Sequence, residues 1–337
     1  MVRHSRRELL RGSLALVGLG VISGCGRVPY PTQQAAEPRT IGFLQPTTGP
    51  YIGTPTAVYE AFRRGLRAIG YVEGKDVVLD YRPGSEPAQY DDLAADLVRR
   101  RVDLIVTSSA AALAAKAQTE TIPVVFGFSG DPVEAGLVDS YSHPGRNMTG
   151  MSFLGERLVA KRLDLLKETA PGIARVAVLA TPTHPGAQRE WRGAQQAAES
   201  LGLALRRLEV STSDDFDRAF AAMVSEPTDA LLVFADGVTL AHRGPIAAFA
   251  LERRLPSVFG WREYAEAGGL LAYGPNTDDA WARIAVFVDK ILKGAKPADL
   301  PVEEPTTFEL TANLKTARAI GLAVPPSVLQ QATELIQ

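Results

Sequence analysis

The stretch from Val102 to Phe126, VDLIVTSSAAALAAKAQTETIPVVF, decides the fold class of this chain. It begins with the apolar run Val102–Val106, continues through the alanine-rich segment Ser108–Ala117, and ends in the apolar run Pro123–Phe126. Short runs of β-branched and aliphatic residues predict buried strands, and the alanine-rich segment predicts a helix between them. A helix that connects two buried strands indicates a βαβ unit in a parallel sheet.

The same alternation extends upstream and then recurs in the second half of the chain. Upstream strands are expected at Thr40–Leu44 and Val77–Tyr81, with helices over Ala57–Ile69 and Tyr90–Val98. The second series predicts strands at Arg175–Ala180, Leu205–Val210, Ala230–Phe234 and Ser257–Phe259, and helices near 186–201, 214–223 and 245–253. The strand starts have similar spacing in both series. The sequence therefore predicts an α/β protein with two Rossmann-like lobes built on parallel sheets.

The last part of the chain departs from this symmetry. Gly268–Gly274 is expected to form a strand or a turn, and Asp278–Leu292 a helix. One face of that helix carries Trp281 among aliphatic residues, and we expect this face to lie in the core. Residues Phe308–Ala319 are expected to form the last part of the folded region.

Length and composition limit the class of protein. A chain of 337 residues suggests two domains of about 150 residues each. Hydrophobic residues make up 46% and charged residues 22%, which is typical of a globular protein. A net charge of −2 argues against nucleic-acid binding. The single cysteine excludes an internal disulfide and a zinc site built from several thiolates.

The first 24 residues have the pattern of an export signal. Several arginines precede the uncharged stretch Gly12–Gly24, which is too short to cross a bilayer as a helix. Ser5–Arg11 resembles the bacterial twin-arginine signal, and Ile22–Cys25 resembles a lipobox. A free cysteine is also common in buried helices, but the place of Cys25 at the end of this leader favours lipidation. We therefore expect residues 1–24 to be a cleaved lipoprotein signal peptide.

Residues 25–38 are rich in proline and polar residues and are expected to form a lipidated tether. Loss of the leader would remove four arginines and Glu8 and change the net charge from −2 to −5. We expect an exported protein in the periplasm or at the cell surface, held to the membrane by its lipid anchor.

Loops that follow the strands are the expected site of function, because ligands of open α/β sheets bind beyond the carboxyl ends of the strands. Hydroxyl groups in the loops of the first half suit a carboxylate or a similar anion, while Asp131 and Asp236 suit an ammonium group. The candidate ligand-binding residues are Thr47, Thr48, Ser108, Ser109, Ser129, Asp131, Thr183, His184, Asp236 and Trp261.

Several of these residues also fit a purely structural role. Ser108 and Ser109 are in position to cap the next helix, and Asp131 before a proline is also typical of a turn. His184 lies between Thr183 and a proline, where a surface turn is equally consistent. Trp261 is consistent with a core position or with a stacking wall.

Motifs of known enzymes are absent from the sequence. It contains no P-loop or Gly-x-Gly-x-x-Gly after the first strand, no Gly-x-Ser-x-Gly elbow and no His-x-x-x-His pair. We expect neither catalytic residues, nor a metal, nor a cofactor.

Five sequence segments resemble the ABC-transporter substrate-binding proteins, including the tryptophan/tyrosine-binding type. These segments are Gly70–Lys75, Gly130–Val133, Asn147–Phe153, Ile291–Pro301 and Asn313–Ala317, followed by Pro325–Ser327. The resemblance extends from about Arg39 to Val328. In the second half, Thr181–Pro185 departs from the Asn-Pro-x-Asn-Pro of many relatives.

The resemblance implies a type I periplasmic-binding-protein fold with a ligand held in a cleft between two lobes. It places residues 39–153 with 275–300 in lobe 1 and residues 154–274 with 301–332 in lobe 2. The implied function is capture of a small solute, such as an amino acid, for an ABC permease. Two alternatives remain: a ligand-binding sensor that presents its lobes to a membrane receptor, and an exported enzyme on the same fold.

Overall fold

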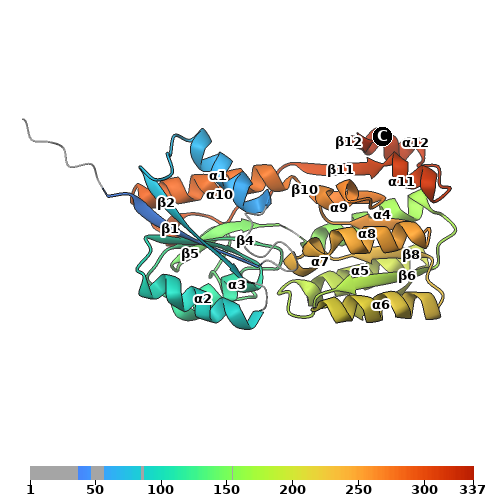
Figure 1. Ribbon diagram of the computed structural model, residues 1–337, viewed down its shortest axis with the longest axis horizontal. Coiled ribbons are helices and arrows are strands. Elements are labelled where there is room, and N and C mark those ends of the chain that lie inside the picture. The colour runs from blue at the N-terminus through green and yellow to red at the C-terminus, as the bar shows by residue number, and fades with distance from the viewer. Residues whose placement is uncertain (1–36, 47–56, 85–86, 154) are drawn as a thin grey trace, which may run out of the picture. The chain divides into compact units, whose positions relative to one another are not determined.

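Two β-sheets organise the part of the chain that the computed structural model describes, residues 37–46, 57–84, 87–153 and 155–337. Each sheet is covered by helices and forms one lobe (Figure 1). Strands and helices alternate along most of the chain, and all strand pairs but one are parallel. The α/β class with two parallel-sheet lobes, expected from the sequence, is confirmed.

The first sheet has five parallel strands in the order β2-β1-β3-β4-β5. Their bounds are β1 Arg39–Pro46, β2 Val77–Gly84, β3 Leu104–Ser108, β4 Val124–Phe128 and β5 Met148–Ser152. Strands β3 and β4 are the apolar runs of the opening stretch, and they are almost wholly buried because helices cover both faces of the sheet.

Four helices sandwich this sheet in the first lobe. Helices α1 (Ala57–Ala68) and α10 (Thr277–Leu292) pack together on one face, and α2 (Pro87–Arg99) and α3 (Ala110–Gln118) pack together on the other (Figure 1). The apolar stripe of α10 includes Trp281, which is 3% exposed and lies in the core of this lobe as expected.

The second sheet has seven strands in the order β12-β11-β10-β9-β8-β6-β7. Their bounds are β6 Arg175–Ala180, β7 Ala204–Glu209, β8 Ala230–Val233, β9 Ser257–Phe259, β10 Leu271–Pro275, β11 Phe308–Asn313 and β12 Glu334–Ile336. The run β7-β6-β8-β9-β10 repeats the order of the first sheet. Strand β11 then pairs antiparallel with β10, which is the departure from an all-parallel sheet.

Helices also cover both faces of the second sheet. Two long helices, α4 (Gly155–Thr169) and α5 (Ala187–Leu201), pack together, and their core also includes residues of α11 (Leu314–Ala319) and α12 (Pro326–Gln331). The core of the other face draws on α6 (Ser213–Ser225), α8 (Arg243–Glu252) and α9 (Arg262–Glu266), with the short α7 (Gly237–Ala241) beside it. Helix α4 is not among the helices expected from the sequence, although Leu158, Leu163 and Leu166 on it are buried.

The chain changes sheet three times. It leaves the first sheet after Ser152, returns after Pro275 to form α10, and leaves again before β11. Two of these crossing segments are joined by hydrogen bonds, since Ser152 N donates to Glu303 O at 2.9 Å and Thr149 Oγ1 donates to Leu300 O at 2.6 Å.

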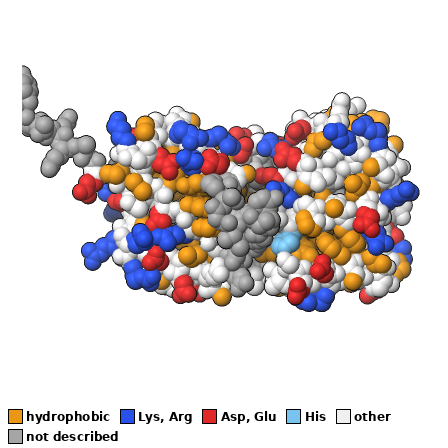
Figure 2. Space-filling model, viewed as in Figure 1, with side chains coloured by type: hydrophobic (Ala, Val, Ile, Leu, Met, Phe, Trp, Pro, Cys, Tyr) orange, Lys and Arg blue, Asp and Glu red, His pale blue; other side chains and the backbone are white. Residues whose placement is uncertain are grey.

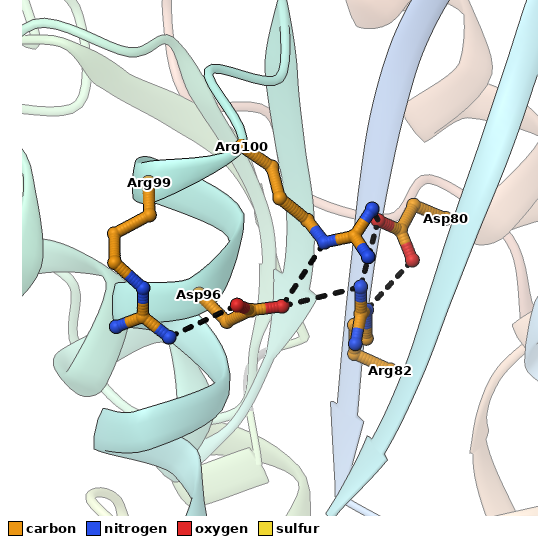
Figure 3. Close-up of polar contacts among 5 residues, drawn as sticks. All are labelled: Asp80, Arg82, Asp96, Arg99 and Arg100. Atoms are coloured by element: carbon orange, nitrogen blue, oxygen red, sulfur yellow. Dashed lines mark hydrogen bonds and ion pairs between the residues drawn. The ribbon is translucent and has the colours of Figure 1, made fainter.

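Ion pairs lie along the edge strand β2. Arg82 is held by Asp80 at 2.6 Å and by Asp96 of α2 at 3.2 Å, and Asp96 also pairs with Arg99 and Arg100 (Figure 3). Charged side chains on an edge strand disfavour pairing with another chain. Elsewhere, basic and acidic side chains are interspersed on the face shown in Figure 2.

Candidate functional site

A cavity of about 250 Å³ opens where strand ends of both lobes meet. It lies beyond the carboxyl ends of β1, β3 and β4 in the first lobe and of β8 and β9 in the second. The lining residues are Gln45, Pro46, Ala57, Val58, Ser108, Ser109, Ser129, Phe153, Gly237, Leu240, Ala241, Arg243, Trp261, Glu263, Thr277 and Trp281. This volume is slightly below the ~300–1,000 Å³ of most small-molecule sites, which suits a small solute.

Aromatic side chains form the apolar part of the wall. Trp281 lies 6.3 Å from Phe153 between ring centroids, and both rings pack against Gly127. A Cβ at Gly127 would lie 2.7 Å from Phe153 Cζ, so the glycine gives room for these rings. Trp261, on the second lobe, is half-buried and also lines the cavity. Trp281 therefore belongs to the core and to the cavity wall.

Three serines of the first lobe supply hydroxyl groups to the cavity: Ser108, Ser109 and Ser129. Ser109 is the N-cap residue of α3, but its side chain makes no capping hydrogen bond. Its backbone has φ 50° and ψ −135°, a region that is costly for any residue with a side chain. A strained residue whose hydroxyl does not cap its helix is typical of a binding site.

Among the described residues that line the cavity, Glu263 is the acidic one. Thr277 Oγ1 donates a hydrogen bond to Glu263 Oε1 at 2.8 Å. The other oxygen, Oε2, has almost no solvent-accessible surface and no hydrogen-bond partner. Burial raises the pKa of Glu263, and hydrogen bonds from its own backbone N–H group and from Thr277, together with the charge of Arg262, oppose this only in part.

Asp131 does not line the cavity. Its Oδ1 accepts hydrogen bonds from the backbone N–H groups of Val133 and Glu134, and its Oδ2 lies 2.6 Å from Arg189 Nη1 of α5. Burial would raise the pKa of Asp131, but these N–H groups and the guanidinium together lower it. Asp131 thus caps a turn and makes an ion pair to the other lobe.

His184 and Asp236 lie in the second lobe, and neither is among the residues that line the cavity. His184 is 5% exposed, and neither ring nitrogen has a hydrogen-bond partner. Burial lowers its pKa, and the nearby Asp236 opposes this shift. Asp236 caps α7 by accepting from Val238 N at 2.6 Å and Thr239 N at 3.1 Å, while its Oδ2 has no partner.

The remaining candidates divide as follows. Thr183 is exposed and is not part of the cavity wall. Thr47, Thr48 and Cys25 lie outside the described residues. Of the ten expected ligand-binding residues, the cavity thus brings together Ser108, Ser109, Ser129 and Trp261.

Glu263, Arg243 and Phe153 line the cavity but are not among the ligand-binding residues expected from the sequence. Glu263 had a signal, because it stands two residues after Trp261 in a loop that follows a strand. Phe153 had a weaker signal at the end of the Asn147–Phe153 segment. Arg243 had none, since it is the first residue of α8 and does not stand in a loop that directly follows a strand.

No group of three or more His, Cys, Asp or Glu side chains among the described residues is arranged to hold a metal ion. No helix in the described ranges is both long and apolar enough to cross a membrane.

Comparison with known proteins identifies the family. Residues 53–336 match the model of the ABC transporter substrate binding protein family. The tyrosine-binding protein of Clostridioides difficile (strain R20291) is 24% identical over 266 residues, which cover 78% of this chain and 76% of that protein.

Two solved structures are similar over nearly their whole length. The ABC domain in complex with L-Trp from Streptococcus pneumonia has a TM-score of 0.81 and 25% identity, covering 89% of this chain and 100% of that one. A conserved domain protein of Vibrio cholerae O1 biovar El Tor has a TM-score of 0.80 and 28% identity, covering 88% and 99%. More distant solute-binding proteins share the two-lobed fold, which is the type I periplasmic-binding-protein fold. The chain belongs to the ABC transporter substrate-binding proteins, which bind a small solute and are not enzymes.

Proposed function

We propose that this protein captures an aromatic amino acid between its lobes and delivers it to an ABC importer. The observation that carries the proposal is one cavity, shared by both lobes, that is lined by two tryptophans, a phenylalanine, three serines and a glutamate. Such a wall suits a small zwitterion with a flat apolar side chain. The tyrosine-binding and L-Trp-bound relatives support the same class of ligand.

The cavity residues fit the parts of such a ligand. Trp261 and Trp281 offer ring faces or edges to the aromatic side chain. Ser108, Ser109 and Ser129 offer hydroxyl groups to the carboxylate, next to the N-terminus of α3, where the helix dipole favours an anion.

Closure of the lobes explains how such a protein holds its solute. A ligand that contacts both lobes binds the closed state more tightly and so shifts the population toward it. The hinge in this proposal consists of the three crossings, after Ser152, after Pro275 and over residues 301–306.

Ligand binding is tested by thermal unfolding of the chain from residue 25 onward, with tryptophan, tyrosine, phenylalanine, leucine, aspartate and lysine. A ligand at 100 times its Kd stabilises the folded state by about 2.7 kcal/mol. We expect a rise in Tm with at least one aromatic amino acid and a smaller rise with the other three. If the aromatic amino acids at millimolar concentration leave the Tm unchanged, the ligand class is wrong.

The membrane anchor is a separate part of the proposal and rests on the sequence of residues 1–38. Diacylation of Cys25 would hold the protein near its permease and raise its effective concentration there. Cys25→Ser is expected to move the protein from the membrane fraction to the soluble fraction. Retention of the variant in the membrane fraction would contradict the lipobox interpretation.

The importer partnership is tested by uptake in cells. Deletion of the gene is expected to abolish high-affinity uptake of the labelled ligand, and the wild-type gene should restore it. Unchanged uptake together with loss of a transcriptional response to the ligand would favour the sensor instead.

A further inference from the structure

Apolar side chains are exposed in the segment that joins α1 to the start of β2, which the ligand site leaves unexplained. Ile69, Val72 and Val78 are 39%, 52% and 40% exposed. They are three of the seven large hydrophobic residues that are exposed in the described part of the chain. Single exposed hydrophobic residues are normal, but a concentration of them marks a surface for a partner or a membrane.

Hydrogen bonds fix the turn over residues 69–76, so its exposed side chains are a property of the folded chain. Lys75 N and Asp76 N both donate to Val72 O, at 3.1 and 2.8 Å. Asp76 Oδ2 accepts from Val72 N at 2.9 Å, and Gly74 N donates to the first residue of β2 at 2.7 Å. The 69–76 turn is therefore closed on itself with Val72 at its surface.

Basic side chains flank the apolar ones in this turn. Arg67 and Lys75 are exposed, whereas the acidic Glu73 is held by Arg63 at 2.6 Å. Apolar side chains between cations are the pattern by which surface segments meet a bilayer that contains anionic lipids.

The 69–76 turn lies beside the point where the N-terminal segment enters the fold. Arg39 N donates to Asp76 O at 3.0 Å, and Arg39 pairs with Val77 in the sheet. Figure 1 shows β1 and β2 side by side at this end of the first lobe. The 13 residues Gly26–Pro38 link this point to Cys25. They reach at most about 50 Å, so a lipid on Cys25 gives this end of the lobe a high effective concentration at the membrane.

We infer that the 69–76 turn rests on the lipid surface, with Ile69 and Val72 at the apolar boundary and Arg67 and Lys75 at the phosphates. The inference rests on the lipid anchor of the proposed function and adds the face of the protein that meets the bilayer. Strand β1 begins at this face and ends at Gln45 and Pro46, which line the cavity. Its eight residues span about 26 Å, so the contact would set the height of the cavity above the headgroups.

Spin labels on three exposed valines test the contact. Cys25 is the only cysteine, so once it is acylated an introduced cysteine is the single thiol. Val72→Cys places the label on the turn, and Val133→Cys and Val224→Cys are controls at the other end of the first lobe and on α6. Each lipidated protein is reconstituted in vesicles of phosphatidylethanolamine and phosphatidylglycerol. The reference is the same chain from residue 25 onward with Cys25→Ser, mixed with the same vesicles.

Collisions with oxygen and with nickel(II) ethylenediaminediacetate separate lipid from water around each label. We expect the oxygen-to-nickel ratio at position 72 to rise at least about threefold on lipidation, and the ratios at 133 and 224 to stay unchanged. With the label at 72, Ile69→Asp should cancel most of the rise. Leu251→Asp, a substitution at a site of similar exposure on α8, should cancel none of it.

Three results would overturn the inference in protein that floats with the vesicles. They are an unchanged ratio at 72, an equal rise at 133 or 224, and a fall in both collision rates at 72, which would mean that protein rather than lipid covers the turn. A full rise in Ile69→Asp would also contradict it. Protein that does not float contradicts the anchor of the proposed function, and the inference falls with it.

Discussion

Arg189 Nη1 lies 2.6 Å from Asp131 Oδ2 and 2.9 Å from Glu134 Oε2, so an ion pair joins helix α5 of the second lobe to the loop after β4 of the first. Beside it the backbones of the two lobes approach closely, since a Cβ on Gly130 would lie 2.9 Å from Gly186 N. Glycine at both positions permits this approach. The ion pair therefore stabilises the arrangement of lobes that encloses the cavity.

Loss of this ion pair should weaken solute binding without removing a ligand contact. We expect Arg189→Gln to raise the Kd about 2- to 10-fold, a modest effect because both side chains are partly exposed to solvent. The measurement is titration calorimetry with small-angle scattering, which should show a more open unliganded protein. Arg192→Gln on the exposed side of α5 is the control. An Arg189→Gln protein with unchanged Kd and scattering would show that the pair does not bias closure.

The strained backbone at Ser109 predicts a trade between stability and binding. Ser109→Gly should stabilise the fold by about 1 kcal/mol, because glycine tolerates φ 50° and ψ −135°. This figure is the strain relieved less the larger conformational entropy that glycine loses on folding. It should weaken ligand binding through loss of the hydroxyl group. Ser109→Ala removes the same hydroxyl but keeps the strain, so it should weaken binding with no gain in stability. Chemical denaturation and calorimetry on the two variants separate these effects, and a destabilised Ser109→Gly would contradict the strain.

The sequence predicted the sheets well, because buried parallel strands are continuous apolar runs and the helices between them have clear apolar periods. It did less well with β5, β12 and α4. Strand β5, MTGMS, is short and contains glycine, and it is a strand because β4 and the 300–303 segment pair on either side of it. Such pairing between distant segments leaves no local pattern.

The sequence indicated which loops surround the candidate site better than it indicated which side chains line it. Strand ends located the cavity, and Ser108, Ser109, Ser129 and Trp261 line it. Asp131 was expected to line the cavity but pairs with Arg189 instead. That partner could not be seen from the sequence, because it lies 58 residues away. Glu263 was missed because what distinguishes it, an unpaired buried oxygen, is visible only once Thr277 is placed beside it.

Tryptophan fluorescence should report ligand binding mainly from the cavity. The chain has three tryptophans, of which Trp261 and Trp281 line the cavity, whereas Trp191 is on α5 near Arg207. Trp261→Phe should remove a large part of the ligand-induced change in fluorescence. Trp261→Ala should raise the Kd at least about tenfold through loss of packing. Trp191→Phe should retain both the change and the Kd. A ligand signal that vanishes in Trp191→Phe would place the ligand elsewhere.

Buried His184 should make the folded state sensitive to acid. Because burial lowers its pKa in the folded protein, the unfolded chain binds a proton more readily below the ordinary value of about 6.5. The free energy of unfolding should therefore be undiminished above pH 7 and fall as the pH drops below 6.5, by up to about 1.4 kcal/mol per pH unit for this group.

His184→Asn should remove this part of the acid sensitivity between pH 7.5 and 5.5, as measured by urea unfolding at each pH. His143→Asn is the matched control, since His143 is exposed. The expectation fails if wild type and His184→Asn lose stability in parallel as the pH falls.

The ion pair between Arg162 and Glu190 predicts the largest loss of stability. Arg162 Nη1 lies 2.9 Å from Glu190 Oε1, both side chains are 2% exposed, and Arg162 Nε donates to Tyr273 O of β10 at 2.8 Å. Removal of one partner leaves a buried charge unpaired, so Arg162→Met or Glu190→Gln should each lower the free energy of unfolding by about 3–5 kcal/mol. The double variant should lose less than the sum of the two, because neither charge then remains unpaired. Urea unfolding of the four proteins measures this coupling, and additive losses would show that each residue acts through other contacts.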